Sequence, residues 1–113
     1  MNHVPVDRLT FEWFSARLKT KFRVDLGPSH RLELELVEVN AARSRSGSLV
    51  SGELARVEGF SLVFTGPSAP LLPQGTYRFE HGPEGFDLFM VPVGRGPDTI
   101  QYEVVFNRII PAG

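Results

Sequence analysis

Apolar and polar residues alternate along much of the chain, which is the period-two pattern of strands with one buried face. The clearest example is residues 31–40, where three leucines alternate with Glu33 and Glu35. The phase of this alternation slips after the leucines, because Val37 and Val39 are the apolar positions of the second half. A change of phase within one strand is typical of a β-bulge or a sharp bend. The pattern therefore predicts a half-buried strand that bends near Val37.

Other segments show the same alternation between turn-forming residues, and each predicts a short strand. These strands are expected at residues 21–25, 60–65, 76–81, 86–93 and 99–107, with residues 53–58 as a weak strand or the return of a loop. In the last strand, Ile100, Tyr102, Val104 and Phe106 share one face, which is predicted to point inward. The tail at 109–111 is expected to leave the sheet.

One segment has the period of a helix rather than of a strand. Phe11, Phe14 and Leu18 recur at the spacing of one helix face, and Thr10 precedes them as a good N-cap. An acidic residue in the first turn and basic residues near the end suit the helix dipole. We expect a helix at about 10–19 whose aromatic stripe packs into the core.

The order of these elements favours an antiparallel fold. Six or seven short strands follow one another without strand–helix–strand alternation, which disfavours a parallel α/β sheet. The sequence predicts a single all-β, mainly antiparallel domain over residues 1–113, built as a small barrel or sandwich with one N-terminal helix. The helix is expected to plug an open end or to lie across one face. Residues 41–52, rich in Arg, Ser and Gly, are predicted to form a flexible loop.

The segment 86–93 differs from the other strands because both of its faces are apolar. Such a strand is either central and covered on both sides, or it leaves a hydrophobic surface exposed. We expect Phe89 and Val91 to be buried beneath the helix; if they are exposed instead, they are the candidate protein interface. Pro92 lacks a backbone N–H, so it is expected at an edge or at a bulge.

Composition and charge restrict the classes of partner. The chain of 113 residues has a net charge of −1, which argues against a general affinity for nucleic acid or for anionic membranes. It contains nine Phe but no Cys, so the core is expected to be aromatic and disulfides are excluded. No signal peptide or apolar membrane span is recognisable, and Arg far outnumbers Lys. We expect a soluble, cytoplasmic bacterial protein.

Candidate catalytic and metal-binding residues are few. His3, His30 and His81 lack further ligands at the spacing of a metal site. Glu33 and Glu35 share an exposed strand face, where charged residues are common without catalysis. No nucleophile stands beside a base, and no glycine-rich turn is placed to cradle phosphate. The sequence therefore predicts no catalytic residue, no metal site and no cofactor, and a protein that is not an enzyme.

Three arginines offer an alternative function. Arg43 and Arg45 lie close together in the predicted loop, and Arg78 lies on the predicted strand 76–81. Clustered guanidinium groups create a local positive potential that attracts anions. A small-ligand or nucleotide-binding β-barrel that uses these arginines as anion contacts is therefore the alternative to a protein-interaction domain.

Several segments together resemble a known family. The most specific is Leu-Pro-Gln-Gly-Thr-Tyr at 72–77, and others are 32–39, 60–64, 89–93 and 102–107. With these segments the chain resembles a family of small bacterial proteins classed as a domain of unknown function. The resemblance covers nearly the whole chain, and it implies neither an activity nor site residues.

What the resemblance does imply is an accessory role beside phage-tail-like collar proteins. Together with the missing catalytic residues, it favours a non-enzymatic protein-interaction or assembly-accessory domain. The expected partner is a protein rather than nucleic acid or membrane, and a homo-oligomer remains an open alternative.

Overall fold

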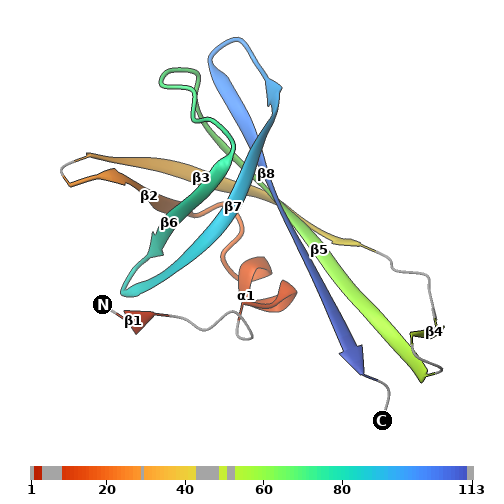
Figure 1. The fold of residues 1–113 in the computed structure, drawn as a ribbon. Coiled ribbons are helices and arrows are strands. Elements are labelled where there is room, and N and C mark those ends of the chain that lie inside the picture. Colours follow the sequence, from red (N-terminus) through yellow and green to blue (C-terminus); the bar gives the residue numbers. More distant parts are fainter. Residues whose placement is uncertain (1, 4–8, 29, 43–48, 51–52, 112–113) are drawn as a thin grey trace.

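The computed structural model describes residues 2–3, 9–28, 30–42, 49–50 and 53–111, with side chains described at 9–28, 30–41 and 59–106. Six strands of one antiparallel sheet close on themselves to form a small barrel (Figure 1). Around the barrel they follow the order β2 (Lys21–Gly27), β3 (His30–Ala42), β5 (Glu53–Pro67), β8 (Thr99–Pro111), β7 (Glu84–Arg95) and β6 (Gly75–His81). The predicted antiparallel all-β barrel is confirmed.

Two short strands extend the sheet beyond the barrel. β1 (Asn2–His3) pairs in parallel with the start of β7, and β4 (Leu49–Val50) forms a hairpin with β5. Because β4 and the end of β3 both lie within residues 41–52, the prediction of a loop over that whole segment was wrong. A strand of two residues is too short to show a period, so it leaves no pattern in the sequence.

The longest ladder of the sheet joins β5 and β8. It runs from Ala55 opposite Pro111 to Pro67 opposite Thr99, and Figure 1 shows the two strands side by side beyond the barrel. The two segments predicted on either side of Gly59 are therefore one strand, and the tail that was expected to leave the sheet belongs to β8. Gly59 interrupts the apolar alternation but keeps its backbone donor and acceptor, so the ladder continues through it.

The register shifts beside the β2–β3 turn, between Asp25 and Gly27, and at two bulges farther along the barrel strands. The register of β3 against β5 shifts between Leu36 and Glu38, which places the predicted bulge at Val37. Leu36 is buried and Val39 packs against the core, so the extra residue keeps both apolar halves of β3 on the inner face. The second of these bulges comes directly after Pro92 in β7, which confirms the expected place of a residue that cannot donate to the ladder.

The helix α1 (Phe11–Ser15) is shorter than the predicted 10–19. Thr10 caps it as predicted, because its side-chain oxygen accepts a hydrogen bond of 3.1 Å from the Trp13 N–H. Beyond the helix, residues 16–19 form turns rather than further α-helix, and the chain then joins β3. The Lys19 N–H, at a φ of 68°, donates to the Leu36 carbonyl at 2.7 Å. Leu18 consequently lies outside the buried stripe to which it was assigned.

The core is aromatic, as the composition predicts. Phe14 of α1 lies at its centre, and its ring meets those of Phe22, Phe60, Phe86 and Phe106 at centroid distances of 5.6 to 6.3 Å. These four rings come from β2, β5, β7 and β8. The helix therefore plugs the end of the barrel where β7 and β8 separate (Figure 1), which was one of its two predicted positions.

Candidate functional site

Exposed apolar side chains gather on the outer face of β7 and β8. Leu88 and Met90 of β7 are buried in the core, so the strand alternation turns Phe89 outward, where 52% of it is exposed. Val93 and Val105 are also more than half exposed, at 53% and 58%. The apolar outer patch consists of Val63 of β5, Phe89, Val91 and Val93 of β7, and Val105 of β8.

The burial expected for Phe89 beneath the helix was wrong, and Val91 is only half-buried. The helix covers the inner side of β7 instead. There, Phe86 packs edge-on against Trp13 at a centroid distance of 5.5 Å and against Phe14 at 6.0 Å. Of the two arrangements that the sequence allowed for this strand, the structure shows the one with an exposed hydrophobic face.

The strand register places two carboxylates within the patch. Val63 of β5 has Glu38 of β3 opposite it on one side and Glu103 of β8 on the other. Glu103 in turn stands opposite Val91 of β7. One row across four strands therefore alternates acidic and apolar side chains. Sequence reasoning missed both glutamates, because each looks like an ordinary exposed acid until the strand neighbours are known.

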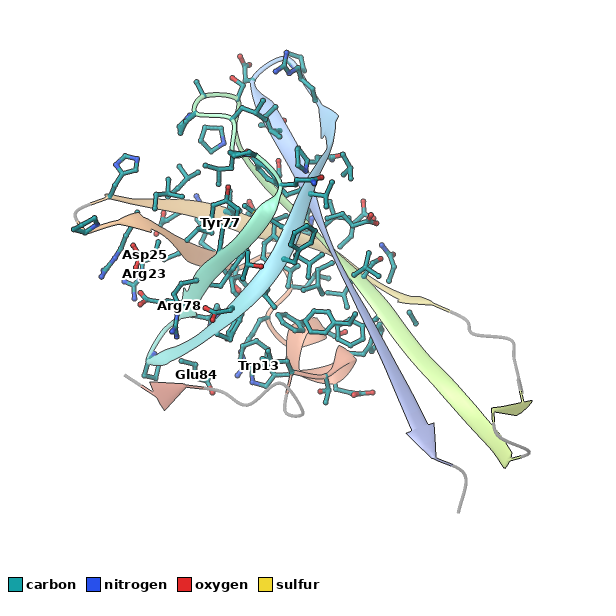
Figure 2. All side chains as sticks on the ribbon, viewed as in Figure 1. Trp13, Arg23, Asp25, Tyr77, Arg78 and Glu84 are labelled. Atoms are coloured by element: carbon teal, nitrogen blue, oxygen red, sulfur yellow. The ribbon has the colours of Figure 1, made fainter. Side chains whose placement is uncertain are left out.

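The outer face of β2 and β6 carries paired charges in place of apolar groups. Arg23 Nη2 lies 3.5 Å from the Oε1 atom of Glu80, and Arg78 Nε lies 3.1 Å from the Oδ1 atom of Asp87. Figure 2 shows Arg23, Asp25 and Arg78 together on this side of the barrel. Each of these two guanidinium groups has a carboxylate beside it.

Of the three arginines proposed as anion contacts, Arg78 is the one that lies among the described residues. The charge of Arg78 is neutralised by Asp87, so its guanidinium already has a partner. Arg43 and Arg45 lie outside the described residues. No geometric observation thus favours the nucleotide-binding alternative.

A polar cluster closes the helix end of the barrel, where Figure 2 shows Trp13 and Glu84. The guanidinium of Arg17 lies over the Trp13 ring, 3.7 Å from its centroid, and its Nη1 donates to the Trp13 carbonyl at 2.8 Å. Its Nη2 lies 3.6 Å from Glu84 at the start of β7. Arg17 therefore ties the end of the helix to the β6–β7 turn.

His81 is the member of this cluster with the most perturbed acidity. Its ring lies 4.5 Å from the Phe22 ring, and its Nε2 is 3.0 Å from the Thr20 hydroxyl. Burial lowers the pKa of His81, the positive charge of Arg17 lowers it further, and the carboxylate of Glu84 acts in the opposite direction. The cluster thus favours a neutral imidazole.

The Thr20 hydroxyl links His81 to the turn that follows the helix. It donates to the Arg17 carbonyl, and it lies 3.0 Å from the Nε2 atom of His81. The pair therefore contributes to the hydrogen bonding that closes this end of the barrel.

In the described segments, no group of three or more His, Cys, Asp or Glu side chains is placed to hold a metal ion. No helix in the same segments is both long and apolar enough to cross a membrane.

The Leu-Pro-Gln-Gly-Thr-Tyr segment at 72–77 has a structural role in the fold. The buried Leu72 donates its N–H to the Tyr102 hydroxyl at 3.0 Å, and the Tyr77 hydroxyl donates to the Pro73 carbonyl at 2.7 Å. Burial raises the pKa of Tyr77, which keeps that donor protonated. The two tyrosines fasten the loop that leads into β6.

Comparison with known proteins adds one match. No curated protein and no solved structure matches the chain. The sequence profile of a family described as a domain of unknown function, DUF6916, matches residues 9–106, which include the helix, five complete barrel strands, the first part of β8 and the apolar outer patch. The chain therefore belongs to the DUF6916 family.

Proposed function

We propose that this chain is a non-enzymatic protein-interaction domain that docks through its apolar outer patch. The observation that carries the proposal is the outward Phe89, half exposed on a strand whose neighbours Leu88 and Met90 are buried. An exposed aromatic ring among exposed valines is typical of an interface anchor, because burying it removes much apolar surface from water. We propose further that the partner is a component of the phage-tail-like assembly that the family resemblance implies.

The size of the patch indicates what else the partner contacts. A specific interface buries about 800 Å² on each partner, which is more than five side chains supply. The polar residues beside the patch, such as Ser61, Thr65 and Gln101, lie on the same outer face and complete such an area. An apolar centre with a polar rim is the common anatomy of protein interfaces.

The ion pair of Arg78 argues against the anion-binding alternative. Its Nε atom lies 3.1 Å from the Oδ1 atom of Asp87, which leaves less positive potential for a bound anion. A cross-strand ion pair of this kind is explained by stability of the barrel.

Site-specific photo-crosslinking in the host cell tests the proposal. A benzophenone amino acid replaces Phe89 or Val105 in the patch, and Lys21 on β2 serves as the control, since β2 lies on the opposite side of the barrel. We expect one discrete adduct from both patch positions and none from Lys21. Equal labelling from all three positions, or no adduct from either patch position, would show that this face is not an interface.

A further inference from the structure

We propose that the partner presents a basic side chain, Arg or Lys, which lies along Val63 and meets the carboxylates of Glu38 and Glu103. This inference rests on the proposed function, and it assigns the chemistry of the partner surface. The occupant is accordingly a protein segment in which a cation stands among apolar residues.

The argument starts from how acids are placed elsewhere on the outer face. On the other side of the barrel, acidic residues stand opposite cations in the register: Glu35 opposite Lys21, Glu33 and Glu80 opposite Arg23, and Asp87 opposite Arg78. Cross-strand pairs of opposite charge stabilise a sheet, and each partner reduces the other's cost of partial burial. On this side of the barrel, each of these acidic residues therefore has a basic residue as a cross-strand neighbour.

Glu38 and Glu103 depart from that pattern. Both have Val63 opposite them, and the other cross-strand neighbour of Glu103 is Val91. Glu103 is half-buried, and none of the three ion pairs among the described residues includes it or Glu38. Within the described part of the chain, Glu38 accepts a hydrogen bond of 3.2 Å from the Asn40 amide.

Among the described residues of β5, β8 and β7, the outward positions nearest to Glu103 do not supply a cation. In the rows on either side of Val63 the register places Asn40, Ser61 and Val105 in one row, and Glu35, Thr65, Gln101 and Gly94 in the other. The cation nearest to these rows in the register is Lys21 of β2, which stands opposite Glu35. The two carboxylates are separated by one intervening strand, which puts their backbones about 10 Å apart. A long basic side chain fits this geometry, since its apolar stem packs on Val63 while its head reaches a carboxylate.

Charge also argues against two other occupants. A second copy of this chain, docked face to face with the two-fold axis at Val63, would bring Glu38 and Glu103 against the same two residues of its partner. Like charges brought together in an interface are strongly unfavourable. Nucleic acid would be repelled by the same carboxylates, because it carries a phosphate charge at every nucleotide. A basic and apolar protein surface is the occupant that complements this face.

The test combines the crosslinker at position 89 with charge reversal in the host cell. Glu103→Arg and Glu38→Arg each place a cation where the partner's cation is proposed to lie, and we expect each to lower the adduct yield by about tenfold or more. Glu103→Gln keeps the size of the side chain and should lower the yield less. Asp98→Arg, an exposed position in the β7–β8 turn, makes the same change in net charge and should leave the yield unchanged.

The possible outcomes separate this inference from the proposed function. An adduct that persists undiminished in Glu103→Arg and Glu38→Arg overturns the basic partner but keeps the interface. An adduct with twice the mass of the chain identifies a second copy and also overturns it. If no adduct forms from position 89 in the wild-type background, the proposed function itself fails. Thermal unfolding of each variant verifies that the barrel is intact, and the crosslinked peptide should contain an Arg or Lys.

Discussion

At the scale of single residues, Phe14 contributes most to holding the barrel together. Its side chain is fully buried, and it contacts rings from four strands that are far apart in the sequence. The barrel is joined between β7 and β8 by a short ladder, from Val91 to Arg95 on β7. The packing around Phe14 is therefore what links these two strands where their hydrogen bonding ends.

We predict that Phe14→Ala destabilises the domain by about 3–5 kcal/mol, because it removes a large buried ring and leaves a cavity that the rigid strands cannot fill. Phe14→Leu should cost clearly less, since most of the volume is kept. Urea unfolding followed by Trp13 fluorescence measures both variants. A loss of under about 1 kcal/mol for Phe14→Ala would contradict a central role for this ring.

Tyr102 and Tyr77 each form a hydrogen bond with the loop before β6, so the costs of losing the two hydrogen bonds can be compared. Tyr102→Phe leaves the Leu72 N–H buried without its acceptor, and we expect a loss of about 1–2 kcal/mol. Tyr77→Phe removes a donor to the more exposed Pro73 carbonyl, which water can replace, so its cost should be smaller. Equal costs in urea unfolding would show that burial does not distinguish the two hydrogen bonds.

At the scale of elements, period-two alternation was sufficient to find the strands of the barrel. It also located the bulge at Val37, because an extra residue changes the phase of the pattern. It did not find the full length of β5 and β8. The ends of these two strands pair with each other through their backbones, and such pairing does not require apolar and polar residues to alternate. The helix was overestimated for a similar reason, since the helical spacing continues to Leu18 while the Lys19 N–H bonds to β3.

Because α1 has only five residues, the contribution of its N-cap to the free energy of unfolding should be large enough to measure. We expect Thr10→Ala to cost about 1 kcal/mol, because the Trp13 N–H loses its acceptor and a helix of five residues has few other hydrogen bonds. Thr10→Ser retains the hydroxyl and should stay near the wild type. The midpoint of urea unfolding measures both variants, and an unchanged midpoint for Thr10→Ala would mean that packing alone holds the helix.

At the scale of the whole molecule, the candidate site depends on which strands become neighbours. The sequence singled out Phe89 and Val91 because both faces of their strand are apolar, but it could not decide whether the helix covers the inner or the outer face. The row of Glu38, Val63 and Glu103 arises from three strands separated by long stretches of chain. Local patterns carry no information about such register, so these carboxylates became recognisable only in the folded barrel.

The stability of the whole domain should depend on pH through His81. Its folded-state pKa is lowered by burial and by Arg17, whereas the unfolded chain has the ordinary value of about 6.5. The unfolded state therefore binds a proton more tightly, so this contribution to stability is complete above about pH 6.5 and is lost as the pH falls toward the folded pKa.

Urea unfolding at pH 5, 6, 7 and 8 measures this dependence. We expect His81→Gln to be less stable than the wild type at pH 8, through loss of ring packing, but to lose less stability between pH 7 and pH 5. His30→Gln is the matched control, because His30 is an exposed residue at the start of β3. Should the His81→Gln curve fall with pH as steeply as the wild-type curve, the acid sensitivity would belong to carboxylates elsewhere on the barrel. Arg17→Gln sharpens the comparison: it removes a cation that opposes protonation of His81, so the folded pKa of His81 should rise toward the unfolded value and less stability should be lost between pH 7 and pH 5.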